Sequence, residues 1–514
     1  MPLFPIRAIA LMRRGNCRQS DTRYRQTPYS ESTTIPTLIL IAPCNPHDGL
    51  QQYNKHQVQA CHIILGIENL ANFGVKDKAN ASKNKKPTAV SITKIVHDKH
   101  ILKQRLFFSH FLRPYPGLFS HSPAIHYLCG QYSMSALYIH IPFCRTRCIY
   151  CDFHSGTDMS LQERYIEALC TEAALRADEL PAPVETLYLG GGTPSQLSPA
   201  LLHKLFTGLS RHIETAHCIE TTIECNPDDL TPLYIEALTK LPINRISMGI
   251  QSFDDGELHF LRRRHTAQAA IDAVERCRKA GFDNISIDLM YSLPGQTLEG
   301  WQHNIERAIG LGIQHISAYA LSYEEGTTLH RLRQTGAVKE CDEELSIAMY
   351  ETLIERLQAA GFEQYEISNF ALPGYYSRHN SSYWQNIPYL GLGAAAHSYD
   401  GSCRRQNPHH TLQYIQSMEE CRCCYKEERL TTDDRFNDML LTRLRTRRGI
   451  DCTKVASTFG PALAGYLARQ AAPYLRQGSM EYDAPYLRIA RHSIFISDSI
   501  IADLFHIEGG DPKV

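Results

Sequence analysis

The sequence lacks a surplus of charge of either sign, because 53 Lys and Arg residues are balanced by 54 Asp and Glu residues. Proteins that bind nucleic acid usually carry a basic surplus, so this balance gives no indication of a nucleic-acid partner. Long apolar runs are also missing. The best candidate, TIPTLILIAP, has half of the roughly 20 residues that a membrane-spanning helix needs, and it ends in Pro.

A disulfide framework is the third absence. The 17 cysteines are scattered along 514 residues, and a chain of this length can bury its core without disulfide staples. Disulfides persist in oxidising compartments, whereas thiols stay reduced in the cytosol. The cysteine usage therefore predicts a cytoplasmic protein in which some thiolates bind metal.

Regular patterning is missing from residues 1–133. They hold a basic, polar stretch, KDKANASKNKKPT, and show no sustained period of 3.6 or 2. Met134 stands directly before the first regular segment, SALYIHIPFC. We therefore treat residues 1–133 as an unrecognised N-terminal extension, with the hypothesis that translation starts at Met134.

From residue 136, short β-rich runs alternate with amphipathic helical stretches. Six such strand–helix units predict an α/β fold built on a partial (β/α)6 TIM-like barrel, and a doubly wound parallel sheet is the alternative. We expect the barrel at 134–365, a linker region at 366–429 and a small C-terminal helical domain at 430–514. The helical domain is expected to end in a hairpin near YLRIARHSIFISDSI.

Three cysteines, Cys144, Cys148 and Cys151, lie within eight positions directly after the first predicted strand. Neighbours this close in one loop would make a strained disulfide. Structural zinc normally takes four N or S ligands, and His154 could complete such a set, so zinc stays an alternative. A [4Fe–4S] cluster has four irons, so three thiolates would leave one iron open to a small molecule. The missing fourth cysteine is therefore a functional clue.

With this spacing, the sequence resembles the radical S-adenosylmethionine (SAM) superfamily, in which the open iron binds the amino and carboxylate groups of SAM. Further segments are similar to the branch that contains oxygen-independent coproporphyrinogen III oxidases and HemW-type heme chaperones. They are LYLGGGTPS, ECNPDDLT, RISMGIQSF, IDLMYSLPGQT and HNSSYW. The resemblance extends from about Met134 into the C-terminal helical domain, and it implies a radical SAM barrel followed by a HemN C-terminal-like domain.

The resemblance also implies a set of residues that contact SAM beside the cluster. They are Tyr138, Tyr150, Gly191, Gly192, Thr193, Glu224, Gln251, Arg263 and Asp288. Taken singly, a glycine triplet is typical of a strand-to-helix turn, and a polar residue at a strand end is typical of a salt bridge or helix cap. As a set on successive strands, these residues favour a ligand site.

The segment RHNSSYW resembles a pattern of the heme-chaperone branch, which implies heme contacts by His379, Tyr383 and Trp384. Heme needs an axial ligand such as His and flat apolar walls for the macrocycle. A single loop His is more often a hydrogen-bonded surface residue. The segment therefore indicates a heme site only in combination with the other motifs. A second cysteine group, at 421–424, fits no cluster or zinc spacing, and we interpret these residues as local thiols.

Phe153 separates the two branches, because the oxidases carry a further Cys at this position. The resemblance therefore favours a heme chaperone that transfers heme to apo-hemoproteins, including respiratory membrane proteins, and that carries a [4Fe–4S] cluster and an exchangeable SAM. The alternative is an oxygen-independent coproporphyrinogen III oxidase, or another radical SAM enzyme acting on a tetrapyrrole in porphyrin biosynthesis. If SAM is cleaved, an electron donor such as a flavodoxin or ferredoxin is also implied.

Overall fold

The computed structural model describes residues 134–507. The predictions for residues 1–133, including a translation start at Met134, concern residues outside this described part. Within it, no helix is long and apolar enough to cross a membrane.

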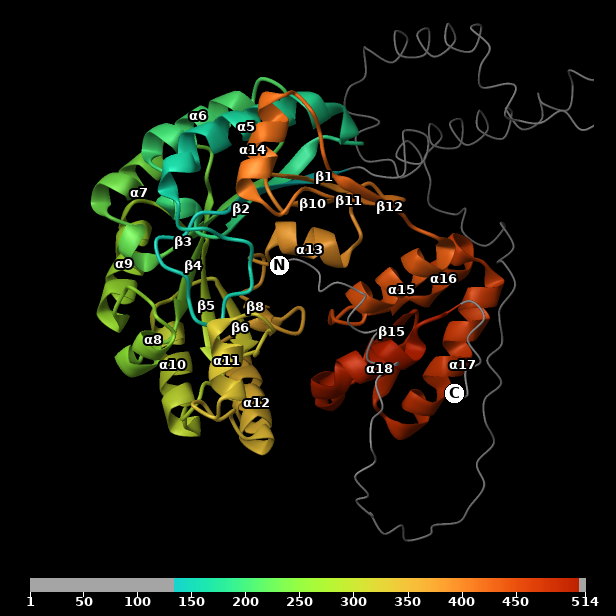
Figure 1. The fold of residues 1–514 in the computed structure, drawn as a ribbon. Coiled ribbons are helices and arrows are strands. Elements are labelled where there is room, and N and C mark those ends of the chain that lie inside the picture. Colours follow the sequence, from blue (N-terminus) through green and yellow to red (C-terminus); the bar gives the residue numbers. More distant parts are fainter. Residues whose placement is uncertain (1–133, 508–514) are drawn as a thin grey trace, which may run out of the picture. The chain divides into compact units, whose positions relative to one another are not determined.

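Six parallel strands form the centre of one large sheet (Figure 1). They pair with one another in the order of the chain. The strands are β1 (Ser135–Ile141), β2 (Val184–Gly191), β3 (Glu220–Cys225), β4 (Arg245–Gln251), β5 (Ile285–Tyr291) and β6 (His315–Ala320). Consecutive pairing without reversal is the barrel topology and excludes the doubly wound alternative, in which the strand order reverses at a switch point.

The sheet stays open at its edges. Its order is β12-β11-β10-β9-β1-β2-β3-β4-β5-β6-β8-β7, so the two outermost strands do not pair with each other. The added strands are β7 (Glu363–Gln364), β8 (Asn369–Ala371), β9 (Tyr389–Leu392), β10 (His397–Tyr399), β11 (Cys403–Gln406) and β12 (Lys426–Arg429). The predicted partial barrel is thus confirmed. The region 366–429, expected as a linker, supplies strands to both edges of this sheet.

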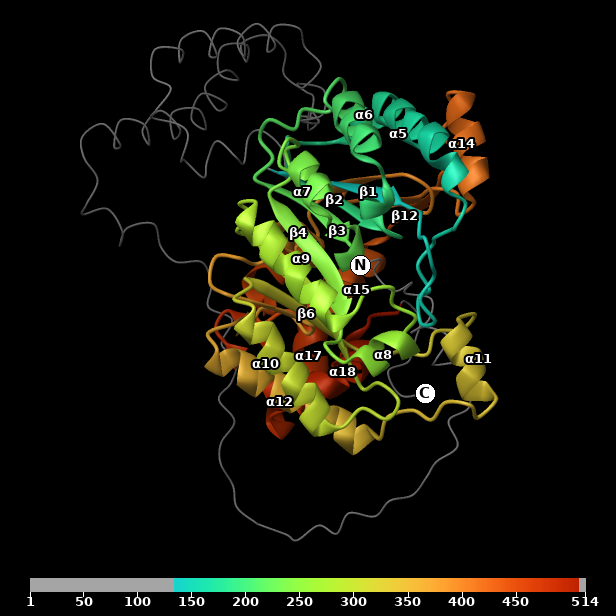
Figure 2. The same cartoon turned by 90° about the vertical axis from the view of Figure 1, so that its left-hand side faces the viewer.

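Helices cover the outer face of the parallel strands and follow one another around it (Figures 1 and 2). They are α5 (Gln162–Arg176), α6 (Pro199–Leu209), α7 (Pro232–Leu238), α9 (Ala267–Lys279), α10 (Leu298–Gly310) and α12 (Glu343–Ala359). Local sequence explains where α6 begins, because the Ser198 hydroxyl accepts a hydrogen bond from Leu201 N at 3.3 Å and Pro199 occupies the first turn. Threonine side chains cap α7, α9 and α10 in the same way.

The parallel strands have one apolar and one polar face. In β1, Leu137, Ile139 and Ile141 are fully buried in the core that the helices cover, whereas Tyr138 and His140 alternate with them. The same alternation places polar side chains on the inner face of the other strands. They are Thr186, Tyr188, Thr222, Glu224, Arg245, Ser247, Ser286, Asp288, His315, Ser317 and Tyr319. A TIM barrel usually fills its interior with apolar side chains, so this polar interior suits a polar ligand.

The C-terminal part has its own hydrophobic core. Its elements are α15 (Thr432–Arg443), β13 (Ile450–Asp451), α16 (Cys452–Phe459), α17 (Pro461–Gln477), β14 (Met480–Asp483), β15 (Tyr486–Ile489) and α18 (Ser497–Leu504). The predicted hairpin is misplaced, because β14 pairs with β15 and residues 491–496 form a 3₁₀ helix that leads into α18. Ile500, Ile501 and Leu504 follow helical spacing and are buried, which explains why this end of the chain is helical.

Candidate functional site

The loop after β1 carries the three predicted cluster ligands. A bridge between Phe143 and Gly156 closes this cysteine loop (residues 143–156), and Cys144 N donates to Gly156 O at 2.9 Å. Within the loop, Cys151 N donates to Cys148 O at 3.4 Å. The backbone therefore holds the three cysteines in one loop at the C-terminal end of a barrel strand, where barrel enzymes place their chemistry.

Side chains from segments that follow other strands reach the sulfur atoms. Thr193 Oγ1 lies 3.3 Å from Cys144 Sγ, and Arg263 Nη1 donates to Cys148 Sγ at 3.3 Å. All three cysteines are free. Burial raises the pKa of the Cys144 thiol, and it raises the pKa of Cys151 to about 12. Metal binding would displace the thiol protons, and the positive charge of Arg263 favours the resulting thiolates.

The zinc alternative gains no support from this geometry. Among residues 134–507, no group of three or more His, Cys, Asp or Glu side chains is arranged to hold one metal ion. His154, the candidate fourth ligand, instead places its Nε2 3.2 Å from Thr411 Oγ1. The thiolates of a [4Fe–4S] cluster bind separate irons at the corners of a cube, so they need not converge on one point.

Two glycines let the end of β2 lie against the cysteine loop. Gly191 has φ +113°, and a Cβ there would lie 2.6 Å from the His140 ring. A Cβ at Gly192 would lie 2.9 Å from Phe143 N. His140 Nε2 lies 3.0 Å from the carbonyl oxygen of His154. The glycine segment therefore supports the cysteine loop through His140, as well as being the predicted SAM contact.

Gly191→Ala is expected to displace the cysteine loop, because the new methyl group forces the His140 ring away from its contact with His154. We expect a cost of about 1–3 kcal/mol in unfolding free energy from the positive φ, and a clearly lower iron content after anaerobic reconstitution. The matched control is Gly295→Ala, where φ is +77° and no atom of the described residues lies within 4 Å of an added Cβ. Equal iron content in the two variants would contradict the clash argument.

Glu224 links β3 to the glycine segment. Its carboxylate accepts hydrogen bonds from the Tyr188 hydroxyl at 2.8 Å and from Gly191 N at 3.1 Å. Burial raises the pKa of Glu224 above its usual range. A carboxyl group in this position can accept hydrogen bonds from a bound ligand's hydroxyl groups.

The inner face is open to solvent at one layer. Tyr138, Glu224, Gly249 and Asp288 are the single residues of β1, β3, β4 and β5 that are not fully buried. Strand pairing places Gly249 beside Asp288. Burial nevertheless raises the pKa of Asp288, because protein surrounds this carboxyl group. The predicted SAM residues of β1, β3 and β5 thus share one accessible layer of a polar interior.

Gln251 ends β4, and Arg263, which follows the next helix, α8 (Asp255–Phe260), reaches back to this strand with its side chain. Gln251 has φ +75°, a strained backbone conformation of the kind that clusters at functional sites. Arg263 Nη2 donates to Asn226 Oδ1 at 2.6 Å and to the Gly249 carbonyl oxygen. Arg263 therefore connects Cys148 with the accessible layer at Gly249.

The two predicted tyrosines occupy different surroundings. The Tyr138 hydroxyl lies 3.0 Å from His140 Nδ1, and its ring stacks on Tyr188 with 6.3 Å between the centroids. Tyr150 packs against a small apolar cluster that includes Ile149 and Leu261. Tyr138 therefore lines the polar interior, and Tyr150 lies within the cysteine loop and packs its side chain against this apolar cluster.

The short helix α13 (Arg378–Trp384) carries the predicted heme segment. The Glu220 carboxylate accepts hydrogen bonds from its first backbone N–H groups, those of Arg378 and His379, at 2.9 Å each. This buried carboxylate fixes the helix start, because a negative charge complements the N-terminal end of a helix.

His379 is buried, and protein groups occupy both of its ring nitrogens. Nδ1 lies 2.9 Å from Thr186 Oγ1, and Nε2 lies 2.8 Å from the Tyr383 hydroxyl. The Tyr188 ring stacks on His379 with centroids 5.0 Å apart. Burial lowers the pKa of His379 to about 3, so the ring is neutral at pH 7. Trp384 is also buried, and its indole Nε1 has no hydrogen-bond partner within the described range 134–507.

Comparison with known proteins identifies the family. The Radical SAM superfamily matches residues 138–308, and the HemN C-terminal domain matches residues 430–496. The heme chaperone HemW of Bacillus subtilis is 37% identical over 336 residues, which make up 65% of this chain and 89% of the relative. The chain belongs to the HemW family of radical SAM proteins.

Two further relatives agree with this assignment. The mouse protein named radical S-adenosyl methionine domain-containing protein 1, mitochondrial, is 32% identical over 389 residues, covering 72% of this chain and 87% of its own. The coproporphyrinogen III oxidase of Escherichia coli superposes with a TM-score of 0.64 over 75% of this chain and 93% of its own, at 23% identity. This last likeness shows the fold alone. The predicted HemW-type resemblance and fold class are confirmed.

Membership of the radical SAM superfamily implies a [4Fe–4S] cluster and SAM as cofactors. The residues present fit both groups. Three free thiols share one loop, a guanidinium contacts one of them, and a polar interior with an accessible layer lies behind. These features meet the need of a cluster for thiolates and of SAM for polar contacts.

Sequence reasoning missed several residues that this HemW-family site brings together. They are His140, Thr186, Tyr188, Glu220 and Arg245. These residues could have been found from the sequence, because polar residues recur at every second position of the parallel strands. Strands that are buried on both faces are usually continuous apolar runs, so this alternation indicates a polar interior.

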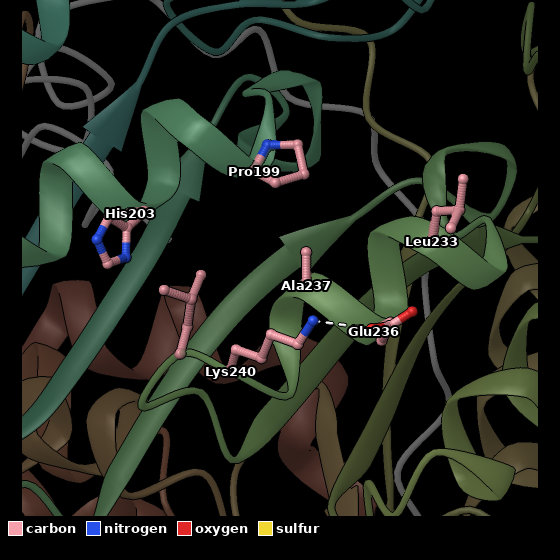
Figure 3. Close-up of a pocket in the computed structure, with 7 residues that line it drawn as sticks. Pro199, His203, Leu233, Glu236, Ala237 and Lys240 are labelled. Carbon is pink, nitrogen blue, oxygen red and sulfur yellow. Dashed lines mark hydrogen bonds and ion pairs between the residues drawn. The ribbon is translucent and has the colours of Figure 1, made fainter.

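A separate hollow of about 340 Å³ lies on the outer surface between α6 and α7 (Figure 3). Its lining includes Pro199, His203 and Leu233, and Lys240 pairs with Glu236 at its rim at 2.8 Å. Leu233 is 79% exposed. None of the predicted site residues lines this hollow.

Proposed function

We propose that this HemW-family chain binds heme and transfers it to apo-hemoproteins, while it carries a [4Fe–4S] cluster and an exchangeable SAM. The single observation that carries the proposal is a continuous chain of contacts from the glycine segment beside the cysteine loop to α13. Gly191 N donates to Glu224, which accepts from Tyr188, whose ring stacks on His379. The relatives named heme chaperones support the same proposal.

Cys144, Cys148 and Cys151 would hold the cluster, whose fourth iron offers SAM a coordination position. Around it, Gly191, Gly192 and Thr193 would contact the amino group of SAM through their backbone. Arg263 and Gln251 would contact its carboxylate, since a guanidinium and an amide donate hydrogen bonds to carboxylate oxygens. Glu224 and Asp288 would accept from the ribose hydroxyl groups, and Tyr138 and Tyr150 would flank the adenine.

His379 would supply the axial ligand of heme, with Tyr383 and Trp384 beside the macrocycle. The neutral state of His379 suits this role, because the neutral imidazole is the form that binds metal. The Tyr383 hydroxyl, 2.8 Å from Nε2, has to move away before iron can bind that nitrogen. Apo-hemoproteins, including respiratory membrane proteins, would accept the heme, and a flavodoxin or ferredoxin would supply electrons if SAM is cleaved.

A hemin titration of the anaerobically reconstituted protein tests this function. We expect a stoichiometric Soret shift that His379→Ala abolishes and that Tyr383→Phe preserves or strengthens, because Phe leaves Nε2 without its competing partner. His217→Ala is the control, since this His lies on the surface and pairs with Glu214. An unchanged Soret shift in His379→Ala would remove His379 from the site.

The oxidase alternative is tested on the same preparation. Reduced protein is incubated with SAM and coproporphyrinogen III, and the products are separated by chromatography. We expect no decarboxylated product, because Phe153 stands, 39% exposed, where the oxidases carry another Cys. Formation of that product would replace the chaperone proposal by the oxidase.

A further inference from the structure

Arg245 is a buried charge without an ion-pair partner among residues 134–507. It begins β4 on the inner face and is only 1% exposed. Among the described residues, no hydrogen bond or ion pair reaches its guanidinium, and its buried Nε has no partner. Leaving a buried guanidinium without partners is strongly destabilising, so a fold retains one where something else binds it.

A second unpaired group lies directly beside it. Thr222 of β3 is the register partner of Arg245, it is fully buried, and its hydroxyl has no hydrogen-bond partner in the part of the chain that the structure describes. Because both side chains point to the inner face from adjacent strands, they present donors side by side. A guanidinium next to a hydroxyl is a typical donor set for a carboxylate.

The neighbouring polar groups are already engaged. His315 Nδ1 lies 2.7 Å from Ser286 Oγ, and His315 Nε2 lies 2.8 Å from the Tyr365 hydroxyl. The Glu220 carboxylate accepts from the backbone of α13, as described above. Arg245 and Thr222 are therefore the groups of this layer that remain available to a ligand.

Arg245 and Thr222 lie too far below the cysteine loop to bind the carboxylate of a SAM molecule that is bound to the cluster. Arg245 lies four residues before Gly249 along β4, which is about 13 Å at 3.3 Å per residue. Gly249 is the residue of β4 whose carbonyl oxygen accepts a hydrogen bond from Arg263. His379, in contrast, lies near this pair, because Glu220, two residues before Thr222 on the same face of β3, accepts a hydrogen bond from His379 N at 2.9 Å.

We infer that Arg245 and Thr222 bind a carboxylate group of the molecule that enters the barrel interior, which for heme is one propionate. This inference rests on the proposed function. Access comes from the layer above, where Glu224 and Asp288 are partly accessible. Binding of this propionate would orient the macrocycle. One edge would point towards the N-terminal ends of the barrel strands, and the iron would lie within reach of α13.

The experiment compares hemin with hemin dimethyl ester, which keeps the ring and the iron but lacks both carboxylates. Reconstituted wild-type protein, Arg245→Met and Thr222→Val are titrated with each compound and, separately, with SAM. We expect wild-type protein to bind hemin about tenfold to hundredfold more tightly than the ester. Arg245→Met is expected to bind both equally weakly, Thr222→Val to lie between, and all three to bind SAM alike.

The alternative outcomes separate the two proposals. Equal binding of hemin and ester by wild-type protein, with hemin still bound, would overturn the carboxylate anchor and leave the chaperone proposal intact. A loss of SAM binding in Arg245→Met with unchanged hemin binding would also overturn it, since the carboxylate would belong to SAM. Failure of wild-type protein to bind hemin would overturn the proposed function and, with it, this inference. Urea unfolding of Arg245→Met shows whether the variant folds, and Thr222→Val keeps the test valid if it does not.

Discussion

Cys148→Ala is expected to abolish the iron–sulfur cluster. Each thiolate of the cysteine loop would bind a different iron, so removing one leaves two ligands for four irons. Anaerobic reconstitution of the wild-type chain should give about four irons and four sulfides per molecule, with the broad visible absorption of a cluster. The variant should lose most of both, because Arg263 Nη1, now without its sulfur partner, cannot replace a thiolate.

The control is Cys424→Ala, which removes a thiol from the second cysteine group (Cys421, Cys423 and Cys424). We interpret these residues as local thiols, so the variant should keep its full iron and sulfide content. A normal cluster in Cys148→Ala, or a lost cluster in Cys424→Ala, would show that the cluster is held elsewhere. The same samples test the binding of SAM. We expect the absorption spectrum of the wild-type cluster to change when SAM is added.

The parts of the fold that sequence predicted are the parts governed by local rules. The alternation of β-rich and helical stretches predicted the six parallel strands, and the spacing of Cys144, Cys148 and Cys151 predicted one loop. The strands β9 to β12 were not predicted. They are three or four residues long, too short for a period of 2 to stand out, and the strand that joins them to the sheet, β9, pairs with β1 far away in the chain.

The candidate site was predicted as a list of residues, without their contacts. Family resemblance supplied His379, but its partner Thr186 lies 193 residues earlier in the chain, and no local pattern connects the two. Arg245 was missed for a different reason. A single Arg at the start of a strand is usually a surface residue, and only the register with Thr222 shows that it faces the barrel interior.

Stability of the barrel should depend on one buried carboxylate, that of Glu172 in α5. Its Oε1 accepts from Arg176 and from Asn407, each at 2.7 Å. Its Oε2 accepts from Gly393 N at 2.8 Å and from the Tyr414 hydroxyl at 2.7 Å. Three of these four hydrogen bonds join α5 to the loop after β9, to Asn407 after β11 and to α14 (Thr411–Glu419), and the fourth lies within α5.

Glu172→Ala is expected to lower the free energy of unfolding by about 3–5 kcal/mol, the usual cost of removing one partner from a buried ion pair. In the variant, the Arg176 guanidinium stays buried without its closest carboxylate. The donors of Gly393, Asn407 and Tyr414 also lose the carboxylate oxygens that accept their hydrogen bonds. Urea unfolding measured by circular dichroism should show the first transition at a clearly lower denaturant concentration. The cluster content at low temperature should stay near that of the wild type, because Glu172 contacts none of the three cysteines.

The matched control is Glu179→Ala, which removes the other carboxylate that pairs with Arg176, at 2.9 Å. Glu179 is partly exposed, so water can replace its contacts, and the expected loss is about 1 kcal/mol. The double variant Glu172→Met with Arg176→Met should recover part of the stability lost in Glu172→Ala, because it removes the stranded charge together with its partner. Equal losses in Glu172→Ala and Glu179→Ala would mean that burial of the pair does not determine its energy. No recovery in the double variant would instead assign the cost to Gly393, Asn407 and Tyr414, whose hydrogen bonds the methionines cannot restore.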